Sequence, residues 1–139
     1  MRKVKPIILT LLILEALFGV SCSNNVKPYA SMHGQIITRL DTRNNKVHIE
    51  GLVPSTLVLV KDYEHRIEDN ALYIKVMLTS HKDGQYKTID FETDLPSNIE
   101  KIFVEDDKSK IMIWEYSQGY AEFDMQERWE KELQKLTPP

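Results

Sequence analysis

The sequence predicts a mainly β fold, an antiparallel β-sandwich or open barrel of six to seven strands followed by a C-terminal α-helix. From Gln35 to Trp114, short segments rich in β-branched and aromatic residues recur with turn residues between them. The last segment, residues 121–136, changes to a helical period. A repeated β-α-β pattern is missing, which argues against a parallel nucleotide-binding sheet.

The first strands are expected in "QIITRL" and "KVHIEGL", with the polar turn "DTRNN" between them. Val47 and Ile49 alternate with His48 and Glu50, which predicts a strand with one buried face and one solvent face. "TLVLVKDYEHRIED" follows as a longer strand that ends in the turn "EDN".

The clearest strand is "ALYIKVMLTS", where Leu72, Ile74, Val76 and Leu78 share one face while Tyr73 and Met77 lie on the other. The pair Asp83-Gly84 then predicts a tight hairpin into "YKTIDFETD". "IEKIFVE" and "KIMIWE", joined by "DDKS", predict one more hairpin.

The C-terminal segment "AEFDMQERWEKELQKL" lacks Gly, Pro and β-branched residues. Met125, Trp129, Leu133 and Leu136 form one stripe at helical spacing. Asp124 with Arg128 and Glu127 with Lys131 are acid-before-base pairs four residues apart, which favour a helix. The helix is expected to begin near Ala121 and to end before "TPP".

The N-terminus has the order of a secretory signal: the basic start "MRKVK", an apolar run over residues 6–20, and small polar residues after it. The run is shorter than the about 20 apolar residues of a spanning helix, and it contains Glu15. We therefore expect residues 1–21 to be cleaved rather than to span a membrane.

The end of this run, "LFGVSC", resembles the lipobox of bacterial lipoproteins, although Gly19 stands where that family usually has leucine. The resemblance implies that Cys22 carries a lipid such as palmitate and becomes the mature N-terminus. It implies a location in the bacterial membrane or envelope, anchored by lipid and facing outside the cytoplasm. The alternative is cleavage nearby by a general signal peptidase, with Cys22 as an incidental thiol.

The expected organisation is a signal peptide (1–21), a lipidated N-terminus and flexible tether (22–33), an antiparallel β domain (34–118), and a C-terminal helix and tail (119–139). Loss of residues 1–21 removes three of 18 basic and one of 21 acidic residues and leaves a net charge of −5. An acidic domain has no electrostatic footprint for nucleic acid or for an anionic membrane surface. Its strand pattern over residues 47–114 is similar to uncharacterised β-rich lipoproteins of Gram-positive bacteria, a resemblance that brings no catalytic residues.

No strong chemical motif stands in the chain. His33, His48, His65 and His81 lack the short paired spacing of zinc ligands, and Glu105, Asp106 and Asp107 lack the spacing of a calcium loop. Solvated histidines and a solvated acidic turn are the preferred interpretations, so no metal, cofactor or catalytic residue is expected. A nucleophile elbow and a phosphate-binding loop are also missing from the sequence.

Trp114, Tyr116 and Trp129 are the candidate interaction residues, since such aromatic residues are favoured at protein interfaces. They form an exposed patch for a partner if the helix stays off the sheet, or a second small core if it packs over the outer sheet face. The predicted function is non-catalytic binding of a protein partner, as in immunity or inhibitor proteins. The alternatives are a structural envelope component and a hydrolase that uses His48 or His65 with a carboxylate.

Overall fold

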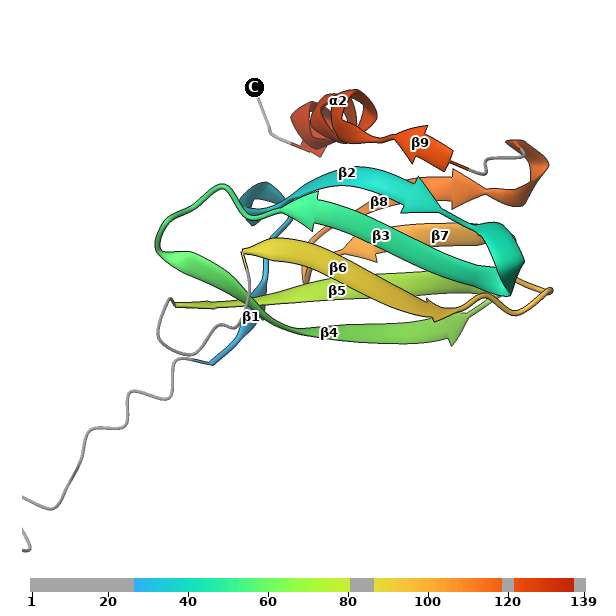
Figure 1. Ribbon diagram of the computed structural model, residues 1–139, viewed down its shortest axis with the longest axis horizontal. Coiled ribbons are helices and arrows are strands. Elements are labelled where there is room, and N and C mark those ends of the chain that lie inside the picture. The colour runs from blue at the N-terminus through green and yellow to red at the C-terminus, as the bar shows by residue number, and fades with distance from the viewer. Residues whose placement is uncertain (1–26, 81–86, 119–121, 137–139) are drawn as a thin grey trace, which may run out of the picture.

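The protein folds as two facing β-sheets, shown by a computed structural model that describes residues 27–80, 87–118 and 122–136 (Figure 1). We call the five-stranded sheet, which contains β5, sheet A, and the four-stranded sheet, which contains β3, sheet B. Sheet A comprises β1 (Tyr29–Ala30), β4 (Val58–Glu68), β5 (Ala71–Ser80), β7 (Lys101–Glu105) and β8 (Lys110–Glu115). Sheet B comprises β2 (Ile36–Asp41), β3 (Lys46–Leu52), β6 (Thr88–Asp94) and β9 (Glu122–Asp124). The prediction of a β-sandwich with a C-terminal helix is confirmed.

Three hairpins follow the predicted turns: β2–β3, β4–β5 and β7–β8. Asn44 and Asn45 in the first turn, and Asp69 and Asn70 in the second, have positive φ angles. Asn and Asp adopt this left-handed backbone more readily than other non-glycine residues, which is why these residues reverse the chain. Short 3-10 turns cover Met32–Gly34, Arg43–Asn45 and Tyr116–Gln118.

The predicted hairpin between β5 and β6 is wrong as a strand pairing, and its Asp83-Gly84 turn lies outside the described residues. β6 pairs with β3 in sheet B, while β5 lies in sheet A. One edge of β5 is taken by β4, and the other is shared end to end by β1 and β7. The chain therefore leaves sheet A for β6 and returns as β7, which makes the β5–β7 pair parallel.

The folded domain begins earlier than the predicted boundary at residue 34. Tyr29 and Ala30 pair with Leu78 and Met77 of β5, and the Met32 side chain is fully buried. The part of the predicted tether from β1 onward is thus part of the sandwich. Two-residue strands carry no alternation, so the sequence pattern could not reveal β1.

The C-terminal helix α2 (Gln126–Leu136) starts later than expected, because Glu122–Asp124 form β9 beside β2. The helix packs against β2 of sheet B and β8 of sheet A. It therefore covers the side of the sandwich on which these two strands lie (Figure 1). Met125 and Trp129 of the predicted stripe are buried in the core between the sheets, and Leu133 and Leu136 pack against that core. The predicted stripe is therefore confirmed as the packed side of this segment, with Met125 one residue before the helix.

Candidate functional site

Two of the three candidate interaction residues are buried. Trp129 is 0% exposed and Trp114 is 5% exposed, and both belong to the same core as the two sheets. The Trp129 indole N–H donates a hydrogen bond of 3.0 Å to the Gln35 carbonyl oxygen. These two tryptophans therefore form neither an exposed patch nor a separate second core, because the helix packs on the side of the sandwich rather than over an outer sheet face.

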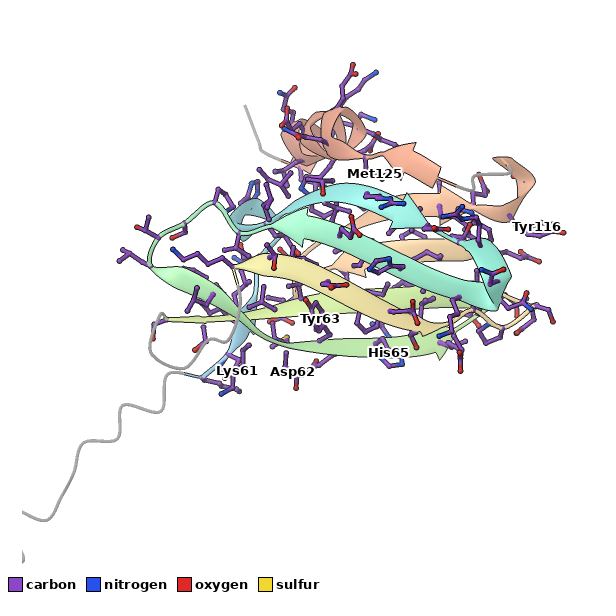
Figure 2. All side chains as sticks on the ribbon, viewed as in Figure 1. Lys61, Asp62, Tyr63, His65, Tyr116 and Met125 are labelled. Atoms are coloured by element: carbon purple, nitrogen blue, oxygen red, sulfur yellow. The ribbon has the colours of Figure 1, made fainter. Side chains whose placement is uncertain are left out.

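Tyr116 is the exposed member, with 71% of its surface accessible. Its ring meets the buried Trp114 ring edge to face, with centroids 6.1 Å apart. Figure 2 shows Tyr116 pointing away from the molecule where the chain leaves β8. A single exposed tyrosine is ordinary on a protein surface.

Cys22, the predicted lipidation site, lies outside the described residues.

The outer face of sheet A carries a row of side chains that crosses four strands. The backbone register places Arg66 of β4 beside Tyr73 of β5, Tyr73 beside Phe103 of β7, and Phe103 beside Met112 of β8. The Tyr73 and Phe103 rings are stacked, with centroids 5.1 Å apart and planes 10° from parallel. We call Arg66, Tyr73, Phe103 and Met112 the aromatic row.

Charged side chains hold this row in place. The Arg66 guanidinium lies 4.2 Å from the Tyr73 ring centroid, and the Lys110 ammonium lies 4.7 Å from that of Phe103. Such cation–π contacts favour the stacked arrangement of the two rings. Arg66 also pairs with Glu105, and Lys75 donates to Asp107 at 2.8 Å.

The electrostatics follow from these pairs. Hydrogen bonding to Glu105 raises the pKa of Arg66, and hydrogen bonding to Asp107 raises the pKa of Lys75. Both cations therefore remain charged across the physiological pH range. The face offers apolar rings bordered by fixed charges of both signs.

A shallow hollow of about 170 Å³ opens beside the aromatic row. It is lined by Glu64, His65, Arg66, Tyr73, Lys75 and Glu105. Small-molecule sites usually occupy about 300–1,000 Å³. The hollow is therefore better suited to one protruding side chain than to a whole metabolite.

The histidines do not converge. His65 packs its ring on Phe91 of β6, with centroids 5.6 Å apart, and Figure 2 shows it along β4 beside Tyr63. His48 lies on the outer face of sheet B with its Nε2 2.8 Å from Asp90 Oδ1. His33 is exposed, and His81 lies outside the described residues.

The His48–Asp90 pair is the nearest match to the predicted histidine and carboxylate of a hydrolase. It sits on a solvent-facing sheet surface, where the Asp90 side chain is largely exposed. Nucleophilic catalysis also needs an activated hydroxyl or thiol held against the histidine. The geometry on this face supports an exposed polar contact between neighbouring strands.

The acidic turn after β7 uses its carboxylates within the protein. Glu105 faces Arg66, Asp107 faces Lys75, and Asp106 accepts backbone hydrogen bonds from Met32, Lys108 and Ser109. Because the three carboxylates point to different partners, they do not surround one cation. Within the described ranges, no group of three or more His, Cys, Asp or Glu side chains is placed to hold a metal ion.

Sequence reasoning placed Tyr73 on the outer face but missed the aromatic row. The alternation in "KIFVE" does put Phe103 and Glu105 opposite Ile102 and Val104. What the pattern could not give is the parallel pairing of β5 with β7, which brings Phe103 beside Tyr73. Only the topology reveals that contact.

Comparisons with known proteins give no match: no family model, no curated protein and no solved structure is similar to this chain. In the part of the chain that the structure describes, none of the helices has the length and apolar character needed to cross a membrane.

Proposed function

We propose that this chain is a lipid-anchored envelope protein with a non-catalytic role, and that it binds a protein partner through the aromatic row of sheet A. The observation that carries the proposal is the stacked Tyr73–Phe103 pair on an outer sheet face, held between Arg66 and Lys110. Tyrosine, phenylalanine, methionine and arginine are the residues that protein interfaces favour.

The arrangement suits a protein partner because it is ordered before binding. Immobilising a side chain on association costs about 0.5–1.5 kcal/mol, and side chains already held by stacking and ion pairs avoid part of that cost. The hollow beside Tyr73 can receive one side chain of the partner, and the charges around it set the register. An immunity or inhibitor protein, which neutralises another protein by covering it, is one form of this function.

The proposed location rests on the lipobox resemblance at Cys22 and on the basic and apolar order before it. A protein held at the outer side of the membrane meets partners that are secreted or displayed there. The proposed localisation and the proposed binding role are therefore consistent with each other.

The test compares capture by three forms of the full chain in solubilised cell envelope. Wild type is expected to retain a stoichiometric protein partner, while Tyr73→Ala, which removes the ring between Arg66 and Phe103, is expected to lose it. His48→Ala is the matched control, since it removes an aromatic side chain from the outer face of the opposite sheet. Circular dichroism is the check that both variants stay folded.

Equal capture by wild type and Tyr73→Ala would exclude the aromatic row as the binding surface. Absence of a stoichiometric partner for all three forms would instead favour the alternative of a structural envelope component. Loss of the partner from His48→Ala alone would show that the binding surface lies on sheet B instead of sheet A.

A further inference from the structure

Exposed leucines gather at one end of the sandwich. The connection from β3 to β4 begins after Leu52, which is exposed, and ends with Leu57, which is 72% exposed. Figure 1 shows this connection at the same end of the molecule as β1 and the first described residues. We call this part, with Tyr29, Leu52, Leu57 and Lys87, the N-terminal end.

The strand register supports that placement. Val58, next to Leu57, pairs with Ser80 at the end of β5, and Tyr29 pairs with Leu78 close by. Leu52 pairs with Thr88 at the start of β6. Leu52, Leu57 and Tyr29 therefore all lie where the strands of both sheets begin or end near the N-terminus of the domain.

The connection is held so that Leu57 faces solvent. Val53 is buried, and its N–H donates to the Lys87 carbonyl oxygen at 2.9 Å. The Leu57 N–H donates to the Ser55 hydroxyl at 3.1 Å. Three of the five exposed large apolar side chains in the described part of the chain, Tyr29, Leu52 and Leu57, thus lie at this end. Such a gathering, unlike a single exposed side chain, is typical of a binding surface.

The short chain between Cys22 and the sandwich limits how far this surface can lie from a membrane anchor. Four residues separate Cys22 from Lys27, the first described residue, so five Cα–Cα steps join them. A fully extended chain covers about 3.6 Å per residue, which gives a reach of about 18 Å. If Cys22 carries a lipid, Lys27, two residues before β1, must stay within this distance of the membrane surface.

We infer that the N-terminal end of the sandwich rests on the lipid bilayer, with Leu57 and Leu52 inserted among the headgroups and upper acyl chains. Tyr29 and the lysines Lys27 and Lys87 lie at the same end, and tyrosine and lysine are favoured at the interface between membrane and water. The inference rests on the lipid anchor of the proposed function. It adds a second membrane contact that fixes the orientation of the domain.

The orientation has a consequence for the binding face. With the N-terminal end on the bilayer, the strands of sheet A run away from the membrane, and the aromatic row faces sideways along it. Ile67, beside the turn at Asp69, then lies at the end of β4 that is away from the lipid.

The experiment uses the lipidated mature chain, residues 22–139, reconstituted in phosphatidylglycerol vesicles whose acyl chains carry bromine, a quencher of tryptophan fluorescence. Leu57→Trp places a reporter at the N-terminal end. Ile67→Trp is the matched control, because Ile67 is 50% exposed on the same strand-loop segment at the far end. The native tryptophans are buried in the core and give a constant background.

We expect the emission of Leu57→Trp to shift to the blue and to lose intensity in brominated vesicles relative to unbrominated ones, and that of Ile67→Trp to be unchanged. Equal quenching of both variants, or quenching of neither, would overturn the inference. Flotation separates this failure from a failure of the anchor. If wild type floats with the vesicles but Leu57→Trp is not quenched, the lipid anchor is supported and the proposed orientation is excluded. If wild type does not float, both the anchor and the orientation are excluded.

Discussion

At the scale of single residues, Asp106 joins the N-terminal segment to the turn between β7 and β8. One carboxylate oxygen accepts the Met32 N–H at 3.0 Å, and the other accepts the N–H groups of Lys108 and Ser109 at 2.8 Å each. Burial by itself would raise the pKa of Asp106, but these hydrogen bonds outweigh it and lower the pKa below its ordinary value of 3.8.

The first prediction concerns the pH dependence of this contact. Because the pKa of Asp106 is lower in the folded state, its carboxylate stabilises the fold above the unfolded-state pKa, and this contribution is lost as the pH falls through the folded-state pKa. Asp106→Asn should therefore destabilise by about 1.5–3 kcal/mol at pH 6, the range for hydrogen bonds to a charged group, and by less at pH 3. Urea denaturation at both pH values measures the difference.

Asp107→Asn is the control within the same turn. The Asp107 side chain is largely exposed, and an exposed ion pair such as its contact with Lys75 contributes about 0–1 kcal/mol. A stability difference for Asp106→Asn that stayed constant from pH 6 to pH 3 would contradict the proposed role of the charge.

At the scale of elements, Gly51 lets β2 and β3 approach each other at the bulge in β2. A Cβ at this position would lie 2.3 Å from the Ile36 carbonyl oxygen, a backbone atom that cannot move without shifting the strand. The register irregularity between Ile37 and Arg39 lies beside it. Glycine in a strand often marks such a close approach of two backbones.

We therefore predict that Gly51→Ala destabilises the protein by about 1–3 kcal/mol or more, the range for overpacking in a core. Gly34→Ala is the comparison, because its Cβ would come closest, at 2.9 Å, to the end of the Leu78 side chain, which can shift more easily than a backbone atom. Thermal unfolding of the two variants gives the ranking, and a smaller loss for Gly51→Ala than for Gly34→Ala would refute it.

The elements also show where prediction from sequence succeeds. Alternation of apolar and polar residues identifies strands with one buried face, as for Val47 and Ile49 or for Leu72 and Ile74, and these residues are indeed in the core. Short strands are not predicted by this alternation, because β1 and β9 pair only two and three residues and are too short to show a period. The order of the strands is not predicted either. The parallel pairing of β5 with β7 depends on which strand edges of sheet A are free when the chain returns from sheet B.

At the scale of the whole molecule, α2 is part of the one core rather than an added element. The stripe of Met125 and Trp129 was predictable from its spacing, but one sequence does not say which surface covers it. The structure shows that both sheets cover the stripe, sheet B through β2 and sheet A through β8. For the candidate site the consequence is large, because two of the three predicted aromatic residues, Trp114 and Trp129, are buried and the outer face of sheet A becomes the candidate surface.

The last prediction follows from that single core. Trp129→Ala removes a fully buried ring and should cost about 3–5 kcal/mol, a large part of the about 5–15 kcal/mol of a typical domain. Trp129→Phe keeps most of the packing but leaves the buried Gln35 carbonyl oxygen without the indole donor, which should cost about 1–3 kcal/mol. Lys131→Ala, an exposed change on the same helix, should stay within about 0.5 kcal/mol.

Urea denaturation followed by far-ultraviolet circular dichroism and by the fluorescence of Trp114 distinguishes one core from two. If the helix and both sheets unfold as one unit, the two signals of Trp129→Phe should give the same midpoint, shifted to lower urea with an unchanged slope. A separate early transition in circular dichroism, with Trp114 still native, would mean that the helix detaches on its own. In that case Trp129 would secure the helix without contributing to the stability of the sandwich.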